Sequence, residues 1–432
     1  MLIIFAYLII VTLCFAKLNK LGLCSLGPNA HPFFFAIYFK FFISCVPVVF
    51  LLFSSELESI LTSKEYGVSY ESLVDGVTYI IICTIILSFI LFIFRILFGR
   101  LYLNYNLDNN TVSFSQFAFF LLILQISWLI LLILSGDAKP IYYLLTNNSI
   151  AANDYKAMLI RGEVGSKMPI ISYIPKYLFT FCPFFFYLLK CSRKTSSLYF
   201  YISILLSSFY FLMSGHKAPL FIFLLFFILM KYRKSKIRVH IHIPLLALIT
   251  FSCAYLFLLN FNYLESPEKL KYGIHQFLER LFISQSQGLF YILEYIQPNV
   301  NYSYNWLPFS SIFIDNISTA DSDVVRILFP DSQSYVNMNS IFIAEAYSVF
   351  GSIGILLSSI WVGIFISFFA YKFRDLSNKD PFFFTPLAYA FFINLPISQN
   401  FTFFISPKET LVFIIFFSIL HLIFNALKKS KS

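Results

Sequence analysis

Long apolar runs constrain the fold of this chain more than any other feature. They are about as long as a membrane-crossing helix needs, since roughly 20 apolar residues span a bilayer core about 30 Å thick. Hydrophobic residues make up 59% of the chain and charged residues 12%, against roughly 45–50% and about 25% in soluble domains. The pattern predicts an all-α, polytopic integral membrane protein, with residues 1–432 forming a single transmembrane domain.

The number of spans follows from the positions of these runs. They lie near 1–16, 33–53, 77–98, 114–134, 171–189, 198–213, 217–230, 243–261, 340–370, 382–396 and 403–426. They predict about eleven transmembrane helices. The run at 340–370 exceeds the bilayer thickness, so we expect it to tilt or to begin as a helix outside the bilayer. The first run lacks a basic n-region and a small-residue cleavage site, which favours a membrane helix over a signal peptide.

Lysine and arginine predict the orientation of the helices. They gather in alternate links, at 17–20, 95–100, 190–194, 231–238, 372–379 and 428–431. The positive-inside rule places these links in the cytoplasm, with the N-terminus outside and the C-terminus inside. The opposite links are 54–76, 135–170, 214–216, 262–338 and 397–402. The first of them carries five acidic residues and one lysine, which fits an outer face.

The link at 262–338 is the longest outer segment, and its length argues against an idle connection. It opens with Ser266, Pro267 and Glu268, which are typical of the start of a helix. The apolar residues that follow recur with a helical period, so we expect an amphipathic helix at the membrane surface or over a cavity. Its second half, 299–338, mixes aromatic and polar residues. This suits sugar rings, and it suits an interfacial aromatic belt equally well.

Several classes of function lack their usual motifs. No P-loop, GxGxxG, HExxH or GxSxG motif occurs in a suitable context, which argues against nucleotide-driven pumping and common hydrolases. The cysteines show no CxxC spacing, and the Asp321-Ser322-Asp323 triplet fits solvated acids better than a metal site. The net charge of +10 is explained by cytoplasmic links. We therefore expect no cofactor, no metal and no nucleic-acid partner.

Four cations on the predicted outer face are candidates for binding phosphate: Arg161, Lys217, Arg280 and Arg326. Each has a plainer interpretation. Lys217 can reach lipid headgroups from the Ser214–Lys217 turn, and each arginine can pair with a nearby acid. Taken together, the group suits a lipid diphosphate, because arginine forks and lysine ammonium groups bind phosphate oxygens.

His275 is a candidate general base in the large outer loop. Glu279 lies four residues further on, on the same face of the expected helix. A histidine beside a carboxylate can accept a proton near neutral pH. A surface helix with ordinary charges is the alternative, and the pattern slightly favours it.

Three short segments carry a resemblance to a known family. The run AEAYSVFGSIGILLSSIWVGIF, residues 344–365, resembles the segment after the large periplasmic loop of O-antigen and capsule repeat-unit polymerases (Wzy-type). The likeness rests on Glu345, Tyr347, Phe350, Gly351 and Gly354. The stretch MSGHKAPLF, residues 213–221, resembles a turn of that family, with Lys217 where arginine is common. Arg280 in FLERLF matches an arginine found early in the family's large loop.

The resemblance implies a glycosyltransferase of the bacterial inner membrane. It would move a growing glycan from undecaprenyl diphosphate to the non-reducing-end hydroxyl of a new lipid-linked repeat unit, beside a flippase and a chain-length regulator. The donor is already activated, so no nucleotide is needed. The resemblance implies that the diphosphate binds Arg161, Lys217, Arg280 and Arg326, that the base is His275 or Glu345, and that Trp306 and Tyr347 contact sugar.

Two alternatives remain open at this point. A flippase or other transporter usually places ionisable residues or broken helices at mid-membrane, whereas the expected helix interiors here carry almost no charge. An O-antigen ligase would share the lipid-diphosphate donor and the general layout, and it would differ in its acceptor, the lipid A core. The sequence favours chemistry at the outer face without separating polymerase from ligase.

Overall fold

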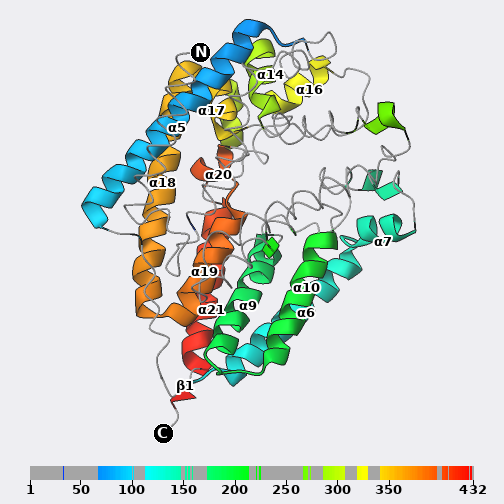
Figure 1. The fold of residues 1–432 in the computed structure, drawn as a ribbon, viewed down its shortest axis with the longest axis vertical. Helices are drawn as coiled ribbons and strands as arrows, with labels where there is room; N and C mark the ends of the chain where they lie inside the picture. The colour runs from blue at the N-terminus through cyan, green and yellow to red at the C-terminus, as the bar shows by residue number, and fades with distance from the viewer. Residues whose placement is uncertain are drawn as a thin grey trace.

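The structure is a computed structural model that describes part of the chain in detail (Figure 1). The described residues are 33, 67–99, 101, 112–146, 151–152, 154–155, 158, 173–213, 220, 223–224, 266–270, 273, 286–306, 319–328, 341–396, 401–406, 408–427 and 429–430. The predicted spans at 1–16, 33–53, 217–230 and 243–261 lie almost entirely outside them. Those spans therefore stay predictions.

The described part of the chain is helical. Its elements are α5 (Tyr70–Phe98), α6 (Ser115–Ser135), α7 (Lys139–Leu145), α9 (Tyr173–Cys191), α10 (Ser197–Met213), α14 (Gln287–Tyr295), the 3-10 helix η4 (Val300–Trp306), α16 (Ala320–Leu328), α17 (Phe342–Phe350), α18 (Ser352–Lys379), α19 (Pro381–Asn394), α20 (Thr402–Ile405) and α21 (Lys408–Leu427). Two short strands, β1 (Val112–Ser113) and β2 (Lys429–Ser430), form an antiparallel pair. Among these helices, α5, α6, α18 and α21 are long and apolar enough to cross a membrane. The prediction of a helical chain with membrane-length helices is confirmed, while the total of about eleven spans stays a prediction.

Helix α9 forms the centre of one group of helices, with α6, α10, α19 and α21 packed around it. A second group pairs α5 with α18 along their lengths, and α19 touches both α9 and α18. Phenylalanine rings fill the interior in edge-on and tilted arrangements. Phe117 and Phe185 have ring centroids 5.3 Å apart, and Phe181 and Phe383 have centroids 5.4 Å apart. Such close contacts matter in a membrane, where lipid is as apolar as the helix faces and packing supplies much of the attraction.

One end of the molecule gathers the predicted cytoplasmic links. The hydroxyl of Tyr371 on α18 donates to the carbonyl of Gly99 at 3.0 Å. Lys194, just after α9, lies over the rings of Phe114 and Phe382, which lie at the starts of α6 and α19. The β1–β2 pair adds the chain after α21 to the same end. We call it the basic end, because Arg95, Lys190 and Lys379 lie in the last turns of α5, α9 and α18.

Several helix boundaries differ from the predicted ones. Helix α18 continues to Lys379 and not to 370, so the predicted link 372–379 is helical. Helix α5 begins at Tyr70 and not near residue 77, so the last part of the predicted link 54–76 is helical. Ser69 explains the early start, since its hydroxyl caps α5 by accepting from the backbone N–H of Ser72 at 3.2 Å. The run 340–370 is divided between α17 and α18 at Gly351, whose φ of 62° is unfavourable for residues with a Cβ. The run 403–426 is similarly divided into α20 and α21 near Ser406.

Candidate functional site

The carboxylate of Glu345 joins three elements that are distant in the sequence. Glu345 lies in the first turn of α17. The indole N–H of Trp306, the last residue of η4, donates to Glu345 Oε1 at 3.1 Å. The backbone N–H of Thr402, at the start of α20, donates to Oε2 at 2.8 Å, and the Thr402 hydroxyl donates to Oε1. Glu345 therefore fixes η4 and α20 against α17.

The surroundings of Glu345 shift its proton affinity. Burial raises the pKa of the Glu345 carboxyl, while hydrogen bonds from Thr402, Trp306 and the Phe401 backbone oppose the rise, and the net pKa lies above its ordinary value. A carboxyl with a raised pKa is suited to accepting a proton. Both oxygens already accept hydrogen bonds, so an incoming hydroxyl would have to share or replace one of these donors. The predicted role of Glu345 as a base stays a prediction.

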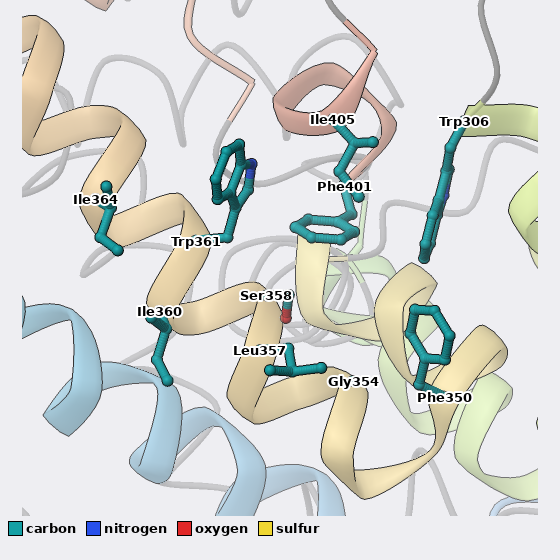
Figure 2. Close-up of a pocket in the computed structure, with 10 residues that line it drawn as sticks. All are labelled: Trp306, Phe350, Gly354, Leu357, Ser358, Ile360, Trp361, Ile364, Phe401 and Ile405. Atoms are coloured by element: carbon teal, nitrogen blue, oxygen red, sulfur yellow. The ribbon is translucent and has the colours of Figure 1, made fainter.

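An apolar groove with a volume of about 330 Å³ is lined in part by Trp306, which donates to this carboxylate (Figure 2). We call it the aromatic groove. Trp306, Phe350 and Phe401 form one wall, with the Trp306 ring centroid 5.7 Å from that of Phe350 and 5.4 Å from that of Phe401. Its remaining lining residues are Gly354, Leu357, Ser358, Ile360, Trp361, Ile364 and Ile405. The groove thus lies on the first half of α18, directly against the elements that Glu345 holds.

The corner between α17 and α18 depends on a glycine. A Cβ added at Gly354 would lie 2.1 Å from the carbonyl oxygen of Ala346 on α17. No side chain fits at that distance, so the first turn of α18 packs directly on the backbone of α17. Gly354 therefore allows α17 and α18 to pack closely, and this packing brings Glu345 near the groove.

The remaining predicted site residues that the structure describes lie on neighbouring elements. Tyr347 on α17 is half-buried, and its ring centroid lies 6.1 Å from that of Tyr79 on α5. Arg326 on α16 has a side chain that is 76% exposed, and its Nη1 lies 3.5 Å from Asp323 Oδ1. The hydroxyl of Tyr302 on η4 donates to Asp323 Oδ2 at 2.9 Å, so α16 is tied to the element that carries Trp306.

The structure therefore brings Trp306 and Glu345 into direct contact and places Tyr347 on the same helix as Glu345. Arg326 lies on the exposed surface of α16. The other predicted site residues, Arg161, Lys217, His275 and Arg280, lie outside the described residues. Their roles stay predictions, as does the amphipathic helix expected after Ser266, of which the structure describes residues 266–270 and 273 and, further along the same stretch, α14.

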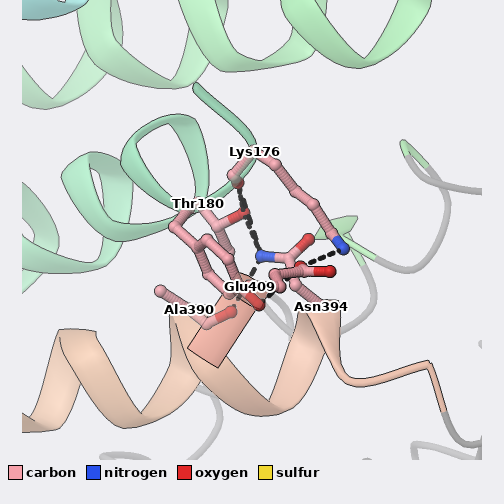
Figure 3. Close-up of polar contacts among 6 residues, drawn as sticks. Lys176, Thr180, Ala390, Asn394 and Glu409 are labelled. Atoms are coloured by element: carbon pink, nitrogen blue, oxygen red, sulfur yellow. Dashed lines mark hydrogen bonds and ion pairs between the residues drawn. The ribbon is translucent and has the colours of Figure 1, made fainter. Parts of the chain in front are cut away.

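A second polar cluster joins α9, α19 and α21, and the sequence reasoning missed it (Figure 3). Lys176 Nζ lies 2.8 Å from Glu409 Oε1, and the hydroxyl of Tyr177 donates to the same oxygen at 2.7 Å. The side chain of Asn394 donates to Thr180 Oγ1 at 3.0 Å. The side chains of Lys176 and Glu409 are 33% and 13% exposed, so this pair is shielded more than a surface ion pair.

A sequence signal for this cluster did exist. Lys176 and Glu409 each stand near the start of an otherwise apolar run, and those runs, 171–189 and 403–426, were interpreted only as membrane helices. Both residues lie in the first turns of helices whose last turns reach the basic end. They therefore mark the opposite end of the bundle. The segment 401–409 contains both Glu409 and Thr402, which is a partner of Glu345.

The Glu345 junction and the Lys176–Glu409 pair are thus two polar centres that lie away from the basic end. Within the described part of the chain, no group of three or more His, Cys, Asp or Glu side chains is placed to hold a metal ion. No protein-family model, curated protein or solved structure matches the chain.

Proposed function

We propose that this protein is an O-antigen or related surface-polysaccharide polymerase. In this proposal it transfers the growing glycan from undecaprenyl diphosphate to the non-reducing-end hydroxyl of a new lipid-linked repeat unit. The observation that carries the proposal is the contact of Glu345 with Trp306 beside an apolar groove on a membrane-length helix. A substrate with a sugar head and a long hydrocarbon chain needs a polar centre and an apolar surface in direct contact.

The chemistry of this transfer assigns roles to the predicted residues. The acceptor hydroxyl oxygen attacks the anomeric carbon of the donor, and the bond from that carbon to the diphosphate oxygen breaks. The diphosphate leaves with the bonding electrons, and the hydroxyl proton passes to a base. We assign the base to Glu345 or His275, and the neutralising cations to Arg161, Lys217, Arg280 and Arg326.

The orientation belongs to the same proposal. The gathering of Arg95, Lys190 and Lys379 at one end supports a cytoplasmic basic end under the positive-inside rule. The loop 262–338 and Glu345 then face the periplasm of a bacterial inner membrane, with the N-terminus periplasmic and the C-terminus cytoplasmic. A flippase would supply the lipid-linked units on that side, and a chain-length regulator would set the polymer length.

Deleting the gene in its host and separating the surface polysaccharide on a gel tests the proposal. A polymerase predicts loss of the ladder with a single repeat unit still attached to the lipid core. Lipid-linked polymer that accumulates without reaching the core would instead identify a ligase. Unpolymerised units trapped on the cytoplasmic leaflet would identify a flippase and contradict the proposed chemistry.

Returning variants to the deletion strain tests the assigned cations. Lys217→Ala and Arg280→Ala should each abolish the ladder while the protein remains in the membrane at normal amount, because the departing diphosphate would lack a counter-charge. Lys269→Ala, which removes a charge from the same large loop as Arg280, serves as the matched control and should leave the ladder intact. A full ladder from both Lys217→Ala and Arg280→Ala would refute the assignment.

A further inference from the structure

We infer that the aromatic groove holds a stretch of the isoprenoid chain of the lipid carrier, with the polar head on the Trp306 side. This inference rests on the proposed function and adds to it the place where the carrier is gripped. Four observations carry it: the chemistry of the lining, the exposure of the groove, the length of α18 that it covers and its contact with the Glu345 junction.

The lining offers a ligand almost nothing but apolar surface. Among the residues that line the groove, the polar groups are already engaged within the protein. Ser358 Oγ donates to the carbonyl of Ile355 at 3.1 Å, and Trp361 Nε1 donates to the carbonyl of Phe404 at 2.8 Å. The indole N–H of Trp306 is held by Glu345. The part of a ligand that enters the groove is therefore hydrocarbon.

The groove opens on a face of α18 that is suited to lipid. Leu357 is 55% exposed, and Trp361 and Ile364 are also exposed. These side chains belong to α18, which is long and apolar enough to cross a membrane. Exposed aliphatic and indole side chains on such a helix meet bilayer hydrocarbon and not water. A chain can therefore enter the groove sideways from the bilayer.

The extent of the groove along α18 determines which way the isoprenoid chain points. Its lining residues on α18 run from Gly354 to Ile364, which is about 15 Å at the helical rise of roughly 1.5 Å per residue. That is about half of a bilayer core some 30 Å thick, so the groove occupies a single leaflet. The start of α18, next to Trp306 and Glu345, is its shallow end, and a polar head must lie there.

The shape and walls favour an isoprenoid over a saturated acyl chain. Four aromatic rings, those of Trp306, Phe350, Trp361 and Phe401, line the groove. A polyisoprene chain has planar double bonds and branching methyl groups, so it loses less conformational freedom between flat walls than a saturated chain does. The volume of about 330 Å³ lies at the low end of ligand sites, at about 300–1,000 Å³, which fits part of a chain with the rest in lipid.

Photolabelling of the full-length protein tests the inference directly. The protein would be placed in nanodiscs of phosphatidylethanolamine and phosphatidylglycerol and exposed to a photoactivatable isoprenyl diphosphate. We expect labelled peptides from residues 350–364 and 401–405. Leu357→Trp, which fills the groove, should lower labelling at least tenfold. That factor corresponds to about 1.4 kcal/mol, roughly the burial of two methylene groups at about 0.8 kcal/mol each.

The matched control is Ile353→Trp. Ile353 lies on the same helix and is 65% exposed, but it does not line the groove, so its labelling should equal that of the wild type. Ile360→Trp provides a second block of the groove if Leu357→Trp does not purify as a monodisperse protein. Wild-type labelling in the groove variants, or label on peptides elsewhere, would overturn the inference.

Three further outcomes distinguish the occupant of the groove, the site and the function. Equal labelling of the groove by a photoactivatable phospholipid with saturated chains would overturn the choice of carrier and assign the groove to ordinary bilayer lipid. Groove-specific labelling in a protein whose deletion strain keeps its polysaccharide ladder would support the isoprenoid site and refute the polymerase. A lost ladder with label outside the groove would refute the site alone.

Discussion

The corner between α17 and α18 makes a quantitative prediction about Gly354. Replacing Gly354 with alanine adds a Cβ 2.1 Å from the backbone oxygen of Ala346. A carbon and a carbonyl oxygen normally lie at least about 3.3 Å apart, so the two helices would have to separate by about 1.2 Å. The opposing atom belongs to the backbone, so no side-chain rotation can relieve the clash.

The expected loss of stability follows from two opposing effects. Alanine stabilises a helix by roughly 0.5–1 kcal/mol relative to glycine. Overpacking a close contact costs typically 1–3 kcal/mol, and more where backbone has to move. Because the clash with the Ala346 backbone is severe, the cost lies at the upper end of this range, and we expect Gly354→Ala to destabilise the protein by about 2 kcal/mol overall and to displace α17, which carries Glu345.

Gly363 on the same helix provides the matched control. A Cβ at Gly363 would meet Ile90 Cδ1 at 3.0 Å and the Cβ and Cγ2 of the same residue at 3.3 Å, which is a tight contact with one side chain and not a clash with backbone. Gly363→Ala should therefore change stability by less than about 1 kcal/mol, since the gain in helix propensity offsets a mild contact. Both variants would be purified in detergent, heated, and scored by the temperature at which half of the protein remains monodisperse.

The polymer ladder provides a second measurement on the same pair of variants. In the deletion strain, Gly354→Ala should shorten or abolish the ladder at an equal amount of membrane protein, and Gly363→Ala should restore it. If Gly354→Ala proved as heat-resistant as Gly363→Ala and polymerised normally, the close packing of α17 on α18 and its role in placing Glu345 would both be wrong.

The remaining predictions concern polar contacts. Glu345→Ala should lower stability by at least about 2 kcal/mol, because it leaves the donors of Trp306 and Thr402 without an acceptor, and it should remove the ladder. Thermal melts and the gel measure these effects, and a wild-type melting temperature would contradict the prediction. Glu409→Ala should reduce the melting temperature more than Lys176→Met does. Glu409→Ala leaves the shielded Lys176 ammonium group unpaired, whereas in Lys176→Met the Glu409 carboxylate still accepts a hydrogen bond from Tyr177. Equal melting temperatures would argue against this pairing. Burial alone would raise the pKa of Glu294, but hydrogen bonds from Ser69 outweigh it and lower that pKa. This contribution to stability is present above the ordinary carboxyl pKa of about 4.3 and is lost as pH falls through the lowered value. Ser69→Ala should therefore show a weaker loss of stability on acidification than the wild type, in melts recorded from neutral pH down to below 4, and identical profiles would refute the contact.

The helical fold could be predicted from the sequence because its main determinant is local. An apolar run of sufficient length forms a membrane helix wherever it stands, and the basic residues of the links sort the helix ends. Lys194, for example, lies with Phe114 and Phe382 at the basic end. The break at Gly351 is harder to predict from the sequence, because a glycine is common inside membrane helices. The sharp corner follows from the packing of Gly354 on the backbone of α17, which only the structure shows.

The candidate site could be predicted only in part, because it depends on contacts between distant segments. The run around Glu345 was identified from the sequence, and so was Trp306, but not their hydrogen bond across 39 residues. The pairing of Lys176 with Glu409 spans 233 residues and depends on the placement of α9 beside α21. No local pattern encodes that placement, so both contacts required the structure.

The central position of α9 has a consequence for how the protein is made. None of the residues of α9, all of which the structure describes, is exposed, and its most extensive contacts are with α19. The ribosome must add 189 residues between the end of α9 at Cys191 and the start of α19 at Pro381, which takes about 10–40 s at roughly 5–20 residues per second. During that interval lipid or an insertase has to cover surfaces of α9 that later face protein. Assembly of the core is therefore a late event, and chains that stop short of α19 should be recognised by membrane proteases as unfinished.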